Sequence, residues 1–172
     1  QQLELDELRV VPTGQAWHKA RGLSAAEHRL AMARLAFADR PAVVVDPREI
    51  QRSGPSYTID TLRELQAEQP GAELLLVIGQ DQAAALTTWR SWEEVARLAI
   101  ICVAARPDDP GAPRPPAPRP LEGLRWRQLD FPQQPVSATD IRQRIARAQG
   151  VAPLVGPAVA RYIADHHLYQ ST

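Results

Sequence analysis

The sequence has very little cysteine: Cys102 is the only one among 172 residues. One thiol cannot form a disulfide within the chain or build a zinc site from several thiolates, and its rarity indicates a reducing compartment. Long hydrophobic runs are also absent. The longest, Leu98 to Ala105, covers eight residues, whereas a membrane-spanning helix needs about 20. No basic segment followed by an apolar one opens the chain. We therefore predict a cytoplasmic protein without a membrane partner.

Excess charge of one sign is absent as well. Lys plus Arg number 20 and Asp plus Glu number 20, so the formal net charge is zero. Proteins that bind nucleic acid normally carry a basic excess, so we expect no nucleic-acid partner. A small anionic ligand needs only a few cations, so the sequence still allows a ligand of this kind. With 44% hydrophobic and 23% charged residues, the chain is typical of one folded globular domain.

Apolar runs of strand length alternate with segments of helical periodicity. Near-continuous apolar strands in such an order predict an α/β, doubly wound Rossmann-like fold, with a parallel sheet and helices on both faces. Ser24 with Glu27, and Ser91 with Glu94, match the capping box that begins a helix. The expected strands cover residues 8–11, 42–45, 74–78, 99–104 and 124–129, the last nearer an edge, and the expected helices cover 24–39, 56–68, 81–86, 91–98, 137–148 and 157–167.

Ligands bind to such sheets at the carboxyl ends of the strands, so the loops there are the places to search for function. One long loop stands out by composition. Residues 107–120 contain seven of the 16 prolines, which predicts an exposed, semi-rigid segment.

The segment V-S-A-T-D-I-R, from Val136 to Arg142, places two hydroxyls at the start of a predicted helix and an arginine one turn later. Free amides, the positive end of the helix dipole, the hydroxyls and a guanidinium together suit a polyphosphate. Serine and threonine are also common helix caps. A capped surface helix with Arg142 in solvent is therefore the alternative interpretation.

The segment I-G-Q-D, residues 78–81, directly follows a predicted buried strand. Gly79 would let a ligand approach the backbone, and Asp81 can accept both hydroxyls of a ribose; the alternative is that Asp81 caps the next helix. Trp89, in a predicted loop, offers a flat surface on which an aromatic ring can stack. We expect the nearby Trp92 to pack in the core.

Other cationic residues lie near the predicted ligand edge. His18 and Lys19, the only lysine, follow the first strand and could reach a phosphate, although in isolation they are typical of a solvated loop. Arg106 ends a predicted buried strand, where a ligand or a neighbouring aspartate could pair with it. His166 and His167 are adjacent on the last helix, and we expect them at the surface because neighbours on a helix cannot face one metal.

The order of these segments resembles the bacterial nicotinate-nucleotide adenylyltransferases over nearly the whole chain. The shared features are Pro12 before His18-Lys19, P-S-Y-T at 55–58, I-G-Q-D followed by T-W at 88–89, Arg106-Pro107, S-x-T-x-I-R at 137–142 and the tail at 155–169. The resemblance implies a nucleotidyltransferase Rossmann-like fold. It also implies adenylyl transfer from ATP to nicotinate mononucleotide with Mg²⁺, giving nicotinate adenine dinucleotide and pyrophosphate.

The resemblance further implies a role for each shared residue. Lys19 and Arg142 would be the catalytic residues, and Trp89 would stack on the nicotinate ring. The residues implied to bind ATP are His18, Gly79, Asp81, Ser137, Thr139 and Arg142. Those implied to bind the mononucleotide are Tyr57, Thr58, Trp89, Arg90 and Arg106. Whether the protein forms a homo-oligomer stays open.

The chain departs from the family at its beginning. Nothing matches the glycine-rich segment G-G-T-F-D-P-x-H-x-G-H, whose histidines bind the triphosphate, and the only methionine is Met32. We therefore expect roughly 25–35 residues, one strand–helix unit, to precede Gln1. Residues 1–172 would then form a single nucleotidyltransferase domain that is incomplete at its N-terminus. Because the missing strand would be central in the sheet, we predict a vacancy beside residues 74–78.

Two other functions stay open. One is another adenylyl- or cytidylyltransferase of the same fold, acting for example on pantetheine phosphate. The other is a non-catalytic nucleotide-binding module that has lost the first motif. Trp89 and the P-S-Y-T segment favour a nicotinate substrate, and a histidine motif upstream of Gln1 would favour catalysis.

Overall fold

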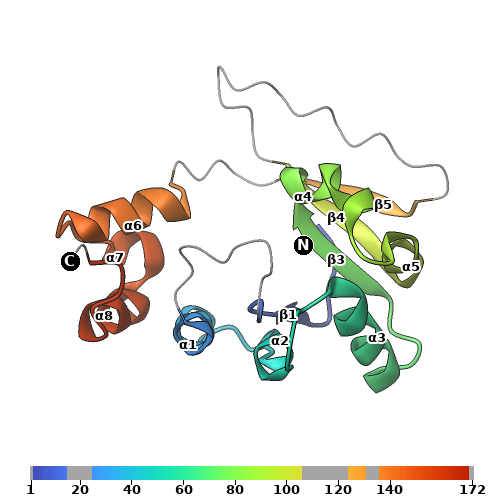
Figure 1. Ribbon diagram of the computed structural model, residues 1–172, viewed down its shortest axis with the longest axis horizontal. Coiled ribbons are helices and arrows are strands. Elements are labelled where there is room, and N and C mark those ends of the chain that lie inside the picture. The colour runs from blue at the N-terminus through green and yellow to red at the C-terminus, as the bar shows by residue number, and fades with distance from the viewer. Residues whose placement is uncertain (1, 15–24, 106–123, 131–135, 171–172) are drawn as a thin grey trace, which may run out of the picture. The chain divides into compact units, whose positions relative to one another are not determined.

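The structure is a computed structural model, and it divides into two compact units (Figure 1). Apart from the two N-terminal residues, the first unit comprises residues 3–56 and 134–172, and the second comprises residues 57–133. No helix in the described part of the chain is long and apolar enough to cross a membrane. The structure describes residues 2–14, 25–105, 124–130 and 136–170.

The first unit contains a pair of short parallel strands, β1 (Leu8–Val10) and β2 (Val43–Val45). Leu8 lies opposite Val43, and Val10 lies opposite Val45. Helix α1 (Ala26–Ala36) lies between the two strands in the sequence, as a parallel crossover requires. The other helices of this unit are α2 (Arg48–Gln51), α6 (Ala138–Ala146), α7 (Ala152–Val155) and α8 (Pro157–Asp165).

Helix α8 packs against α1 through a cluster of rings. The Tyr162 hydroxyl lies 2.9 Å from Nδ1 of His28 on α1. The ring of His166 lies 4.2 Å from that of Tyr162 and 5.1 Å from that of His28, between centroids. His166 and His167 are both exposed, as expected. The ring contacts of His166 were not expected, because they depend on a residue far away in the sequence.

The second unit contains a parallel three-stranded sheet in the order β3-β4-β5. Its strands are β3 (Leu74–Gly79), β4 (Ala99–Ala105) and β5 (Trp126–Asp130). Among the described strands β5 lies at an edge of the sheet, which confirms that expectation. The helices of this unit are α3 (Thr58–Glu68), α4 (Gln80–Ala84), the short 3₁₀ helix η1 (Leu86–Thr88) and α5 (Trp92–Leu98).

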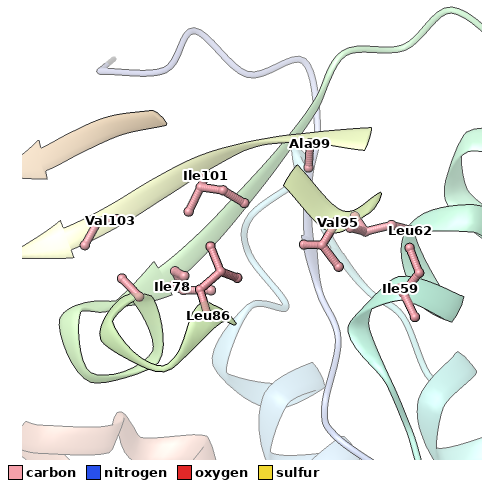
Figure 2. Packing of buried hydrophobic residues seen from close by; sticks show 9 residues of the cluster. Ile59, Leu62, Ile78, Leu86, Val95, Ala99, Ile101 and Val103 are labelled. Atoms are coloured by element: carbon pink, nitrogen blue, oxygen red, sulfur yellow. The ribbon is translucent and has the colours of Figure 1, made fainter. Parts of the chain in front are cut away.

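The hydrophobic core of the second unit forms between the sheet and the four helices α3, α4, η1 and α5. Figure 2 shows Ile59 and Leu62 of α3 beside Val95 of α5, with Ile101 on the central strand β4. Cys102, also on β4, is fully buried, and burial raises the pKa of its thiol. A buried thiol of raised pKa is chemically inert, so this lone cysteine contributes to packing.

The parallel α/β architecture agrees with the sequence-based prediction, but the described strands form two sheets. Among the described strands, β3 pairs with β4 alone. The vacancy beside residues 74–78, and a preceding strand to fill it, stay predictions. The predicted burial of this strand is wrong at Val77, which is 40% exposed.

One of the two expected capping boxes, at Ser91, does not form, and the other involves Ser24, which lies outside the described residues. Helix α1 begins after Ala25, which makes no side-chain capping bond. Ser91 precedes α5 in a left-handed conformation, with φ of 51°, and makes no capping bond. The Glu94 carboxylate instead accepts hydrogen bonds of 2.8 and 2.6 Å from Arg63 of α3, which lower the pKa of Glu94. Glu94 therefore forms an ion pair with Arg63 on another helix, where a local capping bond with Ser91 was expected.

Candidate functional site

The N-terminus of α6 carries a complete capping box. The Ser137 hydroxyl accepts a hydrogen bond from the backbone N–H of Asp140 at 3.1 Å and donates one to the Asp140 carboxylate at 2.6 Å. The Ser137 N–H donates to the same carboxylate at 2.8 Å, and these bonds lower the pKa of Asp140. Ser137 therefore acts first as a cap that begins the helix where the sequence predicts it.

Arg142 does not extend freely into solvent from this helix. Its Nε donates to the carbonyl oxygen of Ala138 at 3.1 Å, and its Nη2 lies 3.5 Å from Oγ1 of Thr139. The guanidinium is therefore folded back over the first turn and half-buried. The structure thus gathers Ser137, Thr139 and Arg142 at the positive end of α6. Free amides, a hydroxyl and a guanidinium are the groups that bind phosphate oxygens.

The end of β3 provides a second group of candidate residues. Gly79 ends the strand and precedes α4, with exposed backbone. A Cβ added at Gly79 would meet no atom of the described residues within 4 Å, so packing among them does not require a glycine here. Asp81 is exposed in the first turn of α4. Because the N-cap is Gly79, the alternative role of Asp81 as the cap is wrong.

Trp89 directly follows η1 and is half-buried. Its indole packs against the hydrophobic core of the second unit, and its backbone N–H donates to Leu86 at 3.0 Å. Trp92 is half-buried too, but it is not among the side chains packed on that core. The expectation that Trp92 occupies the core is therefore wrong. Trp89, which follows η1, packs on the core instead.

Tyr57 and Arg90 are in contact although 33 positions separate them. The Arg90 guanidinium carbon lies 4.7 Å from the centroid of the Tyr57 ring, in a cation–π arrangement. Tyr57 occupies the N-cap position of α3 and packs against the core, and Thr58 is the first residue of the helix. Three residues predicted for the mononucleotide site thus belong to one small region of the second unit.

A buried charged cluster at the carboxyl end of β1 and β2 was not predicted. The Asp46 side chain, 7% exposed, accepts hydrogen bonds of 2.7 Å from Arg48 Nε and 3.3 Å from Arg9 Nη1, and the Arg48 N–H adds one of 3.0 Å. Burial by itself would raise the pKa of Asp46, but the hydrogen bonds and charges of Arg48, with the charge of Arg9, hold that pKa below its ordinary value. A sequence signal that could have predicted this cluster is a carboxylate, Asp46, directly after an apolar strand and two residues before an arginine, Arg48.

Several predicted site residues lie outside the described part of the chain. They are His18, Lys19 and Arg106, together with the proline-rich segment 107–120. Among the residues that are described, no group of three or more His, Cys, Asp or Glu side chains could hold a metal ion.

Comparisons with known proteins agree on one family. Residues 1–144 match the family model described as cytidylyltransferase-like. The chain is 58% identical over 170 residues to the probable nicotinate-nucleotide adenylyltransferase of Albidiferax ferrireducens, covering 99% of this chain and 86% of that protein. The corresponding protein of Methylibium petroleiphilum is 44% identical over 173 residues, covering 98% and 81%.

Solved structures support the fold. The chain superposes on the nicotinic acid mononucleotide adenylyltransferase of Plasmodium falciparum complexed with NaAD with a TM-score of 0.69. The alignment covers 96% of this chain and 83% of that one at 15% identity. The same protein complexed with APC gives a TM-score of 0.67 at 14% identity, with the same coverage. At such identities the likeness shows the nucleotidyltransferase fold and no more.

Proposed function

The chain belongs to the nicotinate-nucleotide adenylyltransferase family, and we propose that it transfers the adenylyl group of ATP to nicotinate mononucleotide. The products would be nicotinate adenine dinucleotide and pyrophosphate. The observation that carries the proposal is the 58% identity to the Albidiferax ferrireducens protein over 99% of the chain. The exposed Gly79–Asp81 turn and the groups gathered at the start of α6 are of the kind that this reaction needs.

In this reaction the mononucleotide phosphate attacks the α-phosphorus of ATP in line, and pyrophosphate leaves. The protein forms no covalent bond, so its contribution is to position two anions and to stabilise the charge on the departing group. We propose that Thr139 and Arg142 contact the phosphates. Ser137 would keep the α6 amides oriented through its cap, since its hydroxyl proton already engages Asp140.

The remaining proposed roles are divided between the binding of ATP and the binding of the mononucleotide. Gly79 and Asp81 would bind the adenosine ribose, and Tyr57, Thr58, Trp89 and Arg90 the nicotinate end of the mononucleotide. We also propose that His18 and Lys19 lie near the phosphates, that Lys19 is catalytic, and that Arg106 lies near the mononucleotide. We propose as well that residues 1–172 form a single domain, that the protein is cytoplasmic and that it has no nucleic-acid partner.

The family implies Mg²⁺ together with ATP. The described residues do not fit a metal held by the protein alone, because they contain no group of three or more suitable side chains. Mg²⁺ in such enzymes is held largely by substrate phosphates and water. When bound, Mg²⁺ would neutralise phosphate charge. The chain's own residues would position the two substrates, as described above.

The experiment that tests the proposal is a substrate comparison with the purified protein, ATP and Mg²⁺. We expect release of pyrophosphate and formation of nicotinate adenine dinucleotide with nicotinate mononucleotide. Faster turnover with pantetheine phosphate, or with CTP in place of ATP, would favour the other transferases of this fold. Nucleotide binding without any product would favour the non-catalytic module.

A further inference from the structure

The first unit contains a cluster of three rings, those of His28, Tyr162 and His166, to which the proposed function gives no role. His28 lies on α1, Tyr162 lies on α8, and His166 is the C-cap of α8. Imidazole nitrogens are the commonest metal ligands in proteins and suit divalent transition metals such as Zn²⁺. Two imidazoles that meet from separate helices are therefore a candidate metal site.

The spacing of the two imidazoles suits a shared metal ion. A zinc–nitrogen bond is about 2.0–2.1 Å long, which places the centres of two imidazole rings on one tetrahedral ion about 5 Å apart. The centroids of the His28 and His166 rings are 5.1 Å apart, with 57° between the ring planes. The packing of α8 on α1 thus already sets the separation that one ion requires.

One nitrogen of His28 already has a hydrogen-bond partner. Its Nδ1 lies 2.9 Å from the Tyr162 hydroxyl oxygen. In the tautomer whose Nδ1–H donates to that oxygen, Nε2 keeps the lone pair that binds a metal. A histidine bound to a metal almost always donates its second nitrogen to such a partner, which fixes the tautomer and the ring orientation. Tyr162 would therefore be a positioning residue for the ligand His28.

His166 is available as the second ligand. The residue is exposed, and among the described residues no hydrogen bond or ion pair engages its ring. The ring contacts that of Tyr162 at 4.2 Å between centroids. Such a ring contact does not use the nitrogen lone pair, which lies in the plane of the imidazole. The adjacent His167 is exposed too, and no ring contact in the described part of the chain joins it to the cluster.

We propose that His28 and His166 form a binding site for a divalent transition-metal ion, with Zn²⁺ as its probe, that joins α1 to α8. No group of three or more His, Cys, Asp or Glu side chains among the described residues could hold a metal. Water would therefore complete the coordination, and we expect an exchangeable ion. The site differs in chemistry from that of the Mg²⁺ that accompanies ATP, because Mg²⁺ takes oxygen ligands. The proposal does not depend on the proposed function.

The test measures thermal unfolding of the tag-free protein with and without ZnCl₂, together with a calorimetric titration. An ion that binds the folded chain alone raises the midpoint of unfolding. At ten times the measured dissociation constant we expect a rise of about 3–6 °C, and the titration should give one ion per chain. His28→Gln and His166→Gln should each abolish the rise, and MgCl₂ should not produce it. Tyr162→Phe should weaken zinc binding about 10- to 100-fold, as the loss of a partner behind a ligand does.

His167→Gln is the matched control, because it removes an exposed imidazole next to His166 that belongs to no ring contact of the cluster. It should keep the full rise, with each variant compared with its own zinc-free midpoint. No rise in the wild type, or a rise that survives in both His28→Gln and His166→Gln, would overturn the proposal. If a variant fails to fold, NMR of the wild-type imidazoles decides: zinc should shift the signals of His28 and His166, and unshifted signals would equally overturn the site.

Discussion

Gly14 lies where the backbone leaves no room for a side chain. A Cβ added there would clash with the carbonyl oxygen of Glu49 and lie 2.7 Å from the Ser56 hydroxyl oxygen. That hydroxyl donates to the same Glu49 carbonyl, and Arg29 donates to the carbonyl of Gly14 at 3.3 Å. This glycine therefore lets the segment after β1 pass close to the end of α2.

The first prediction is that Gly14→Ala destabilises the fold by about 1–3 kcal/mol, because the nearest neighbour is the Glu49 backbone carbonyl, which cannot move aside cheaply. Thermal or urea unfolding measures the loss. Gly150→Ala is the control, since a Cβ at Gly150 would meet nothing within 4 Å. Equal stability of the two variants would show that the close approach at Gly14 is absent in solution.

Arg142 is the residue on which the proposed phosphate binding most depends. Arg142→Ala should raise the KM for ATP and lower kcat, at a cost of about 2–4 kcal/mol of transition-state stabilisation. The physical reason is that negative charge accumulates on the departing pyrophosphate, next to which the guanidinium is proposed to lie. Steady-state kinetics on Arg142→Ala and on Arg144→Ala, an exposed arginine of the same helix, separate a specific role from a loss of general charge. Unaltered kinetics in folded Arg142→Ala would show that this residue has no part in phosphate binding.

Trp89 has two roles to separate, because it packs on the core and is proposed to stack on the nicotinate ring. Trp89→Ala should weaken binding of nicotinate mononucleotide by roughly 5- to 150-fold and leave ATP affinity nearly unchanged. Since the indole is only half-buried, the stability loss should be less than the ~3–5 kcal/mol of a fully buried tryptophan. Separate binding titrations and thermal unfolding measure both effects. Equal weakening of both ligands would contradict the stacking role.

At the scale of the elements, the buried carboxylate of Asp46 connects β1, β2 and α2. It follows β2, binds Arg9 of β1 and binds Arg48 of α2. Its own backbone N–H donates to the carbonyl of Val10 at 2.9 Å, which extends the pairing of the two strands. No residue of β1, β2 or α2 is fully buried, so we expect the charged cluster to contribute much of what holds these short elements together.

Asp46→Asn should therefore cost about 1–3 kcal/mol at neutral pH, because it removes the negative charge that Arg48 and Arg9 bind, while Arg9 keeps its ion pair with Glu7. The pH dependence has a definite sign. Since the pKa of Asp46 is lowered in the folded state, its stabilisation is fully present above the unfolded-state pKa of about 3.9 and is lost as the pH falls through the folded-state value. The difference in unfolding free energy between wild type and variant should accordingly be constant above about pH 5 and shrink below about pH 4. A difference independent of pH would mean that the carboxylate charge has no part in it.

At the scale of the whole molecule, sequence patterns predicted the order of strands and helices well. The α/β alternation, the parallel pairing, the edge position of β5 and the cap of α6 at Ser137 are all confirmed. These features depend on residues close together in the chain, such as an apolar run of strand length or a serine three residues before an aspartate. Two short helices, α2 and α7, were missed because four residues are too few for a periodic pattern.

By itself the sequence determined the α/β class, the family and the segments that carry candidate site residues, because periodicity and motif order are properties of the chain alone. Only the tertiary structure decided which partner each charged or aromatic side chain takes. It paired Glu94 with Arg63 in place of Ser91, placed Arg90 over Tyr57, turned Trp89 toward the core and buried Asp46 between two arginines. The physical reason is that such partners come from distant segments, and their free energy depends on burial and on distances that exist only once the strands and helices have packed.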